Sequence, residues 1–170
     1  TLEEKYSEMN EIYRSWLERD IAYLGVKKTE AFGQMIQLLA DQPGQVINYS
    51  SLCSALNISL PTLKNYLWYA QKTFIIEKLT PFHRSSKREI VKSPVFYFRD
   101  LGMRNFVLGD FVLRNISEEF LGGKDEGLLF ENFVFRLLWD KYKTGLHRLH
   151  FWRTPDGTEV DFVVKHGREL

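Results

Sequence analysis

A short acidic segment near the end of the chain carries residues whose types and spacing suit metal chemistry. Residues 151–164, FWRTPDGTEVDFVV, place turn-forming residues 155–157 between two runs rich in β-forming residues, which predicts a β-hairpin. Successive side chains of a strand point to opposite faces, so Glu159 and Asp161 share one face, and alternate apolar residues from Val160 onward occupy the other. Paired carboxylates suit Mg²⁺ or Mn²⁺. An edge hairpin with one solvated face explains the same pattern.

The helix expected before this hairpin places a further carboxylate on its apolar side. The pattern of residues 127–143, GLLFENFVFRLLWDKYK, predicts an amphipathic helix with a solvent-facing stripe of Asn132, Arg136, Asp140 and Lys143. At roughly 100° per residue, Glu131 lies about 135° from the centre of that stripe. A buried lone charge costs several kcal/mol, so Glu131 must be partnered, protonated or bound to a cation. A salt bridge to a buried Arg or Lys is the alternative to a metal ion.

These two segments, GLLFENFVFRLL and FWRTPDGTEVDFVV, resemble the C-terminal region of a family of prokaryotic AAA-type ATPases, a domain of unknown function behind the ATPase core. That region resembles a winged helix followed by a restriction-endonuclease-like fold of the PD-(D/E)XK class. In this class a helix glutamate, a strand aspartate and a Glu-x-Lys on the next strand form the metal and catalytic site. The resemblance implies that Glu131 and Asp161 are catalytic and bind Mg²⁺ or Mn²⁺ in the intact domain.

The Glu-x-Lys of that class is missing. The chain stops at residues 167–170, where the next strand is expected, and Glu169 has no Lys two positions later. In this class the Lys positions water or stabilises developing phosphorane charge. We therefore expect a nuclease-like domain that is truncated at its C-terminus and a polypeptide that is inactive by itself. Residues 1–4 already show helical pattern, which suggests a fragment cut at both ends, and without a G-x-x-x-x-G-K-[ST] motif we expect ATP to bind in a missing N-terminal domain.

Bulk composition predicts a globular protein. The 170 residues are 44% hydrophobic and 15% aromatic, which argues against disorder. The formal net charge is +1, so any contact with nucleic acid must depend on local patches. The single cysteine, Cys53, excludes an internal disulfide; neither a signal peptide nor an apolar run of membrane-spanning length occurs. These features predict a cytoplasmic protein.

The first half of the chain predicts helices followed by a helix-turn-helix. One helix is expected over residues 1–24 with Gly25 as its C-terminal cap, and another over residues 30–40. A helix-turn-helix is then expected over about residues 49–74. Its signals are, in order, a cap at Ser50 or Ser51, a turn at Asn57-Ile58, a cap at Ser59 and Pro61 in the first turn of the third helix.

The third helix of this motif is predicted to have one apolar and one polar face. Leu63, Leu67, Ala70 and Phe74 are expected in the core. The opposite face, with Thr62, Asn65, Tyr69 and Lys72, is the one that a recognition helix presents to the major groove. This face contains Trp68 and Tyr69 but no Arg, the commonest specific base reader, so sequence-specific binding is only weakly indicated. Helix-turn-helix motifs also serve protein contacts.

A basic wing is expected next. Residues 75–82 and 94–98 read as paired strands, about 75–98 in all, and the loop between them has four basic residues against Glu89. Basic wings contact phosphate without sequence preference, whereas an isolated charged loop is simply solvated. The candidate nucleic-acid-binding residues are Thr62, Lys64, Asn65, Tyr69, Lys72, Arg84, Lys87, Arg88 and Lys92.

The segment after the wing joins the two expected modules. Asp100, Gly102 and Arg104 match a Tyr-Phe-x-Asp-x-Gly-Leu-Arg pattern of the relatives, and Asp100 is expected to cap a short helix over residues 101–108. Residues 122–127, GGKDEG, read as a linker. This predicts a helical and winged-helix region over residues 1–121 and the start of a nuclease-like domain over residues 122–170.

Two functions fit this α+β architecture of helices, a winged helix-turn-helix and a truncated nuclease-like domain. In the first, the chain is the nucleic-acid-associated module of an ATPase, with DNA and the N-terminal ATPase domain as partners. In the second, it is a non-enzymatic interaction module that regulates or recruits the ATPase through exposed aromatic residues. The sequence leaves the oligomeric state open.

Overall fold

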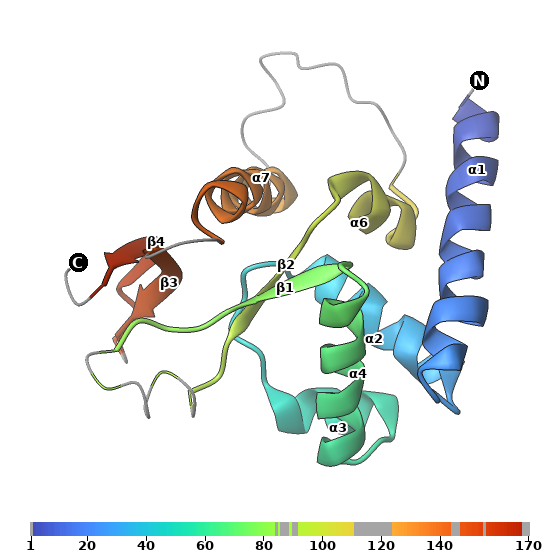
Figure 1. The fold of residues 1–170 in the computed structure, drawn as a ribbon, viewed down its shortest axis with the longest axis horizontal. Helices are drawn as coiled ribbons and strands as arrows, with labels where there is room; N and C mark the ends of the chain where they lie inside the picture. Colours follow the sequence, from blue (N-terminus) through green and yellow to red (C-terminus); the bar gives the residue numbers. More distant parts are fainter. Residues whose placement is uncertain are drawn as a thin grey trace.

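The computed structural model describes residues 2–83, 85, 89, 92–110, 124–143, 147–154 and 156–167. The α+β class predicted from the sequence is confirmed (Figure 1). In the part of the chain that the structure describes, no helix is both long enough and apolar enough to span a membrane. In chain order the elements are α1 (Leu2–Ser15), the π-helix η1 (Trp16–Ile21), α2 (Thr29–Asp41), α3 (Tyr49–Leu56), α4 (Leu60–Lys72), β1 (Ile76–Leu79), β2 (Val95–Phe98), α6 (Leu101–Val107), α7 (Lys124–Tyr142), β3 (His147–Arg153) and β4 (Glu159–His166).

The first helical stretch ends where the sequence predicts. α1 runs along one side of the molecule and continues through η1, whose π-helical winding the sequence did not indicate (Figure 1). Gly25 has a φ of 81°, a left-handed conformation that costs glycine little. Its N–H donates to the Ala22 carbonyl at 2.9 Å, and the Val26 N–H donates to the Ile21 carbonyl. These bonds close the helix by satisfying its last carbonyl groups.

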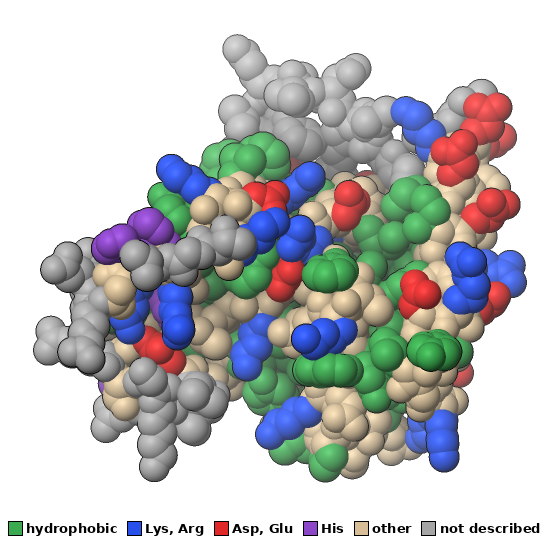
Figure 2. Space-filling model, viewed as in Figure 1, with side chains coloured by type: hydrophobic (Ala, Val, Ile, Leu, Met, Phe, Trp, Pro, Cys, Tyr) green, Lys and Arg blue, Asp and Glu red, His purple; other side chains and the backbone are tan. Residues whose placement is uncertain are grey.

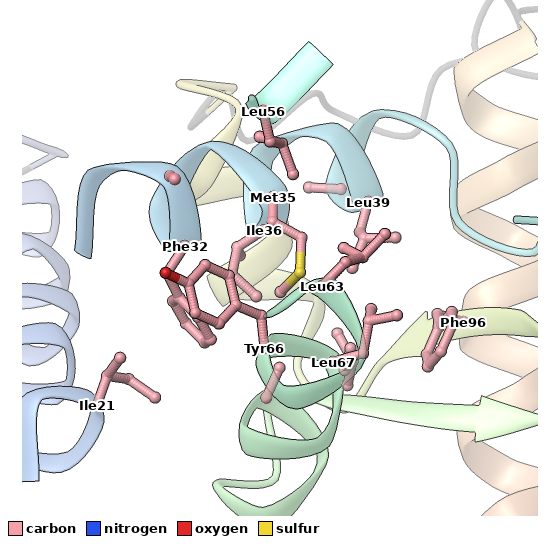
Figure 3. Packing of buried hydrophobic residues seen from close by; sticks show 14 of the residues in the cluster. Ile21, Phe32, Met35, Ile36, Leu39, Leu56, Leu63, Tyr66, Leu67 and Phe96 are labelled. Atoms are coloured by element: carbon pink, nitrogen blue, oxygen red, sulfur yellow. The ribbon is translucent and has the colours of Figure 1, made fainter. Parts of the chain in front are cut away.

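The main core lies between α2 and α4. Figure 3 shows Phe32, Met35 and Ile36 of α2 directed toward Leu63 and Leu67 of α4. All five side chains are buried. Removing such a side chain from water contributes about 1.5–3 kcal/mol, so this contact is a major source of stability. The predicted core positions of Leu63, Leu67 and Ala70 on α4 are therefore confirmed.

The ends of α3 and α4 are fixed by local hydrogen bonds. Asn48 caps α3 by accepting from the Ser51 N–H at 3.1 Å, so the predicted cap at Ser50 or Ser51 was wrong. The helix begins earlier than expected, and the Ser50 hydroxyl instead lies 2.8 Å from the Asn48 amide oxygen. Asn57 adopts the left-handed conformation at the predicted turn, with φ 49°. Ser59 caps α4 as predicted, accepting from the N–H three residues later at 3.3 Å.

Phe74 is not part of the core face of α4, contrary to the prediction. The helix ends at Lys72, and the Thr73 hydroxyl donates back to the Tyr69 carbonyl at 2.9 Å. Phe74 then has a φ of 60°, which turns the chain away from the helix direction. Its side chain is 68% exposed, because helical periodicity no longer applies beyond the last turn.

The strands expected around the basic loop form a two-stranded antiparallel sheet. β1 pairs with β2 in a register that runs from Ile76 opposite Phe98 to Leu79 opposite Val95. The loop before α3 lies along the other edge of β2, where the Gly44 N–H donates to the Phe96 carbonyl at 3.0 Å. α6 follows β2, with the predicted cap: the Asp100 carboxylate accepts from the backbone N–H of the third residue after it at 2.7 Å.

The last part of the chain combines α7 with the β3–β4 hairpin. The two strands pair antiparallel, with a register shift between His150 and Trp152. Phe151 of β3 also bridges to the chain that follows β1: the Phe82 N–H donates to its carbonyl at 2.5 Å. α7 begins at Lys124, so the linker predicted over residues 122–127 is helical from that residue onward. The predicted domain boundary falls at residues 121–122, outside the described residues.

A second core joins elements from both sides of that boundary. It contains three residues of the β1–β2 sheet, one of α7 and two of β3, namely Leu79, Val95, Tyr97, Phe135, Leu149 and Phe151. Its centre is the face-to-face stack of Tyr97 on Phe135, whose ring centroids are 4.3 Å apart. The division into two domains stays a prediction, but the two parts share this hydrophobic cluster.

Candidate functional site

Glu131 lies where α7 crosses β2, and its partner is a tyrosine. The Tyr97 hydroxyl donates to Glu131 Oε1 over 2.5 Å. Tyr97 is 1% exposed, whereas Glu131 is half-buried. The sequence predicts that Glu131 needs a partner, and this hydrogen bond supplies one. The salt bridge to a buried Arg or Lys, weighed as the alternative, is not formed among the described residues.

The surroundings of this pair disfavour negative charge. Burial raises the pKa of Glu131, the Tyr97 hydroxyl acts in the opposite direction, and the nearby carboxylates of Asp161 and Glu159 raise this pKa further. Burial, followed by the bond to Glu131, also raises the pKa of Tyr97. The proton therefore stays on the tyrosine, and Glu131 is the acceptor. The three acids lie within electrostatic range of one another without a compensating cation at Glu131 among the described residues.

The backbone at Gly44 closes over the same pair. Gly44 has a φ of 74°, and a Cβ placed there would overlap Glu131 Oε1 and lie 2.9 Å from Tyr97 Cε1. Only glycine fits this close approach. In the sequence, Gly44 reads simply as part of a Gln-Pro-Gly helix stop, and its role in covering the Glu131–Tyr97 pair depends on a contact between segments far apart in the chain.

Asn132, predicted on the solvent face of α7, is fully buried. Its side-chain oxygen accepts from the Phe98 N–H at 2.9 Å, and its nitrogen donates to the Phe98 carbonyl at 2.8 Å. An amide can satisfy a donor and an acceptor together, so Asn132 completes the hydrogen bonds of the β2 backbone that faces α7. Arg136 and Asp140 of the predicted stripe are exposed as expected. Polar periodicity cannot distinguish a solvated amide from one that binds a backbone.

Asp161 and Glu159 lie on β4 and are exposed. Glu159 is 3.6 Å from the Arg153 Nε across the hairpin. Phe162, between the acid positions and the core, packs toward Tyr97 with ring centroids 5.8 Å apart. Val160 was expected in the same apolar layer, but it is 45% exposed. It pairs with the half-exposed end of β3 beyond the register shift, so the apolar layer begins only at Phe162.

Glu131 and Asp161 are the candidate ligands for a divalent cation. One or two carboxylates are often enough to hold Mg²⁺ with water, and Glu131 and Asp161 influence each other electrostatically. Within the described part of the chain, however, no group of three or more His, Cys, Asp or Glu side chains could hold a metal ion. The catalytic and metal-binding roles of Glu131 and Asp161 therefore stay predictions, and no reaction step is assigned to a metal.

The predicted recognition face of α4 is partly exposed to solvent. On α4, Lys64, Asn65 and Lys72 are exposed and Trp68 is 50% exposed. Lys72 Nζ lies 5.5 Å above the Trp68 ring, a cation–π arrangement. Figure 2 shows basic and apolar side chains interspersed over this part of the surface.

Two of the predicted contacts are already engaged within the fold. The Thr62 hydroxyl lies 2.8 Å from the hydroxyl of Ser59 in the helix cap. Tyr69 is half-buried against the main core. In the basic loop, Lys92 is exposed, and Arg84, Lys87 and Arg88 lie outside the described residues.

Two protein-family models together match most of this chain. Residues 1–113 match the model of a domain of unknown function, DUF8612. The chain belongs to this family. Residues 126–170, which include Glu131 and Asp161, match a second domain of unknown function, DUF4143, typically found in the C-terminal regions of AAA ATPases. The DUF8612 chain is thus similar to ATPase-associated modules, as the sequence resemblance implied.

Longer bacterial proteins resemble the DUF8612 chain over nearly all of its length. Uncharacterized proteins of Mycobacterium tuberculosis and Mycobacterium bovis are each 29% identical over 153 residues, 89% of this chain and 33% of the relative. An uncharacterized protein of Haemophilus influenzae is 26% identical over 166 residues, 94% of this chain and 37% of the relative. The chain thus spans about a third of the length of these relatives. No solved structure matches.

Proposed function

We propose that this chain is the nucleic-acid-associated module of a cytoplasmic AAA-type ATPase, in which α3, α4 and the β1–β2 hairpin act as a winged helix on DNA. The observation that carries the proposal is the exposed stripe of α4 formed by Lys64, Asn65, Trp68 and Lys72. The opposite side of α4 is buried in the main core. A recognition helix is expected to combine these features, one fixed face and one free polar face.

The chemistry of this stripe favours contact with the backbone of DNA. Lys64 and Lys72 are point charges that neutralise phosphates, and Asn65 can pair with a base edge. The described part of α4 has no arginine, so strong discrimination between base pairs is not expected. Binding of this kind has dissociation constants on the order of 10⁻⁴–10⁻⁶ M at physiological salt and weakens steeply as salt rises.

The test is fluorescence anisotropy of a labelled duplex across a salt series, with the double variant Lys64→Gln and Lys72→Gln. Each lost phosphate contact removes about 0.9 from the slope of log K against log salt, so the slope should fall by nearly two along with the affinity. Lys5→Gln on α1 and Lys141→Gln on α7 remove matched exposed lysines and should leave the slope unchanged. If the double variant binds like the wild type, α4 does not contact DNA.

A specific observation also favours a protein-binding function. Trp68, Tyr23 and Phe74 are 50%, 91% and 68% exposed, and a groove of about 460 Å³ lies between η1 and the end of α4. Exposed aromatic anchors are typical of protein interfaces. In the full-length ATPase, Trp68→Ala would then change the ATP hydrolysis rate in the absence of DNA, whereas Lys64→Gln, at a residue that does not line the groove, would not. An unchanged hydrolysis rate in Trp68→Ala, together with loss of DNA binding in the double lysine variant, would favour the DNA function.

The nuclease-like part of the proposal has its own test. If Glu131 and Asp161 hold Mg²⁺ or Mn²⁺ in the full-length protein, plasmid nicking should require the metal and disappear in Asp161→Asn. Glu159→Gln, which removes a neighbouring acid of the same strand, is the matched control and should retain nicking. Intact DNA binding without nicking would leave a nuclease-like scaffold that has no cleavage activity.

A further inference from the structure

A cavity of about 310 Å³ lies where β1, the end of α7 and β3 meet. It is separate from the exposed stripe of α4 and from the Glu131–Tyr97 pair. Cationic and aromatic side chains share its wall: Lys78 and Arg148 come from the strands, and Trp139, Tyr142 and Lys143 from α7 and the residue after it.

His150 contributes a polar atom whose partner is missing. The side chain is 4% exposed, and its Nδ1 lies 3.2 Å from the Thr80 hydroxyl. Its Nε2 is buried and has no hydrogen-bond partner among the described residues. When the threonine hydroxyl donates to Nδ1, the neutral ring carries its proton on Nε2, which then requires an acceptor. Burial lowers the pKa of His150 and so favours this neutral ring.

The charges around the cavity leave an excess of cation. Glu89 also lines it, but its carboxylate accepts from the His83 N–H at 3.2 Å and lies 3.6 Å from Lys165 Nζ, a cation outside the cavity. Lys143 is paired with an aspartate of α7 at 2.8 Å. In the described part of the chain, Lys78 and Arg148 form no ion pair. Their charges are therefore available to an anion.

We propose that this cavity binds a nucleotide, either free or as the phosphorylated end of a strand. Its phosphate would lie between Lys78 and Arg148, which provide two cations at the cavity wall. The base would stack on Trp139 or Tyr142, because every nucleobase has an aromatic face and such stacking tolerates any sequence. Ligand pockets measure roughly 300–1,000 Å³, and this cavity, at the lower limit, suits one nucleotide unit.

Calorimetric titration of the chain with AMP, inorganic phosphate and a 5′-phosphorylated oligothymidine tests this proposal. We expect AMP to bind at least fivefold more tightly than phosphate, since only AMP has a base to stack. Lys78→Gln and Arg148→Gln should each weaken AMP binding at least fivefold, and Lys5→Gln should leave it unchanged. Trp139→Leu should reduce the preference of AMP over phosphate. Circular dichroism checks that each variant is folded.

The source of the nucleotide follows from the same titrations. Tighter binding of the oligonucleotide than of AMP would assign the cavity to strand ends, and equal or weaker binding would assign it to free nucleotides. The variant Lys64→Gln with Lys72→Gln should leave AMP binding intact, so failure of the DNA proposal does not affect this one. Absence of AMP binding, or binding that neither Lys78→Gln nor Arg148→Gln alters, would overturn the proposal.

Discussion

Replacing Gly44 with alanine tests the close approach of three segments at the Glu131–Tyr97 pair. Gly44 has a left-handed backbone, and a Cβ would meet both Glu131 Oε1 and the Tyr97 ring. The Gly44 N–H is also fixed to the Phe96 carbonyl at 3.0 Å, so the loop cannot move away without losing a bond. The new methyl group must therefore displace the Glu131 side chain.

Two costs add in this variant. A left-handed conformation costs a non-glycine residue about 1–2 kcal/mol. Displacing Glu131 breaks its bond with the Tyr97 hydroxyl, and a hydrogen bond to a charged group contributes about 1.5–3 kcal/mol. Because Glu131 is only half-buried, we use the low end of that range. Gly44→Ala should therefore lower the free energy of unfolding by about 3 kcal/mol.

Urea denaturation followed by circular dichroism measures this loss, with Gly25→Ala as the matched control. Gly25 has a similar φ of 81° but no atom within 4 Å of its Cβ position, so only the backbone cost of about 1–2 kcal/mol applies there. Adding Glu131→Ala to Gly44→Ala should cost less than the sum of the two single changes, because the overlap disappears. Equal losses for Gly44→Ala and Gly25→Ala would refute the close approach.

Two further predictions concern α7. Asn132→Ala leaves a buried N–H and carbonyl of β2 unpaired and should cost about 3 kcal/mol in urea denaturation, whereas Asn65→Ala on the exposed face of α4 should cost less than about 0.5 kcal/mol. Equal effects would contradict the buried amide contact. Because the folded pKa of Glu131 is raised above 4.5, this group makes the protein less stable as pH rises through the window above 4.5. Glu131→Gln should remove that part of the pH dependence, and an unchanged slope in Glu131→Gln would refute the pKa shift.

The elements that local chemistry determines could be predicted from the sequence. The helix caps predicted at Gly25, Ser59 and Asp100 are confirmed. They could be predicted because capping hydrogen bonds join residues only a few positions apart. The core positions predicted within α4, Leu63, Leu67 and Ala70, were also confirmed. The prediction that Phe74 lies in the core was wrong, because its position depends on where α4 ends. Helical periodicity alone does not give that end.

The site was predictable only in part. The position of Glu131 on the apolar side of α7 indicated a carboxylate in need of a partner, and it has one. Nothing in the spacing pointed to Tyr97, which reads as one residue of a strand, or to the glycine that closes over it. The buried Asn132 was missed for the same reason: its partner is the backbone of a strand more than thirty residues away, and the backbone leaves no signature in a sequence.

The hydrogen bond from Tyr97 gives Glu131 a structural role that is compatible with the predicted catalytic one. A carboxylate accepts through two oxygens, and Tyr97 occupies Oε1 alone. A hydroxyl donor at one oxygen fixes the orientation of the carboxylate and lowers its pKa, whereas burial and the acids of β4 raise it. A cation near Asp161 would oppose the same repulsion. The fold therefore holds Glu131 in a setting where added positive charge is favourable, and the hydrogen bond from Tyr97 fixes the orientation of this carboxylate.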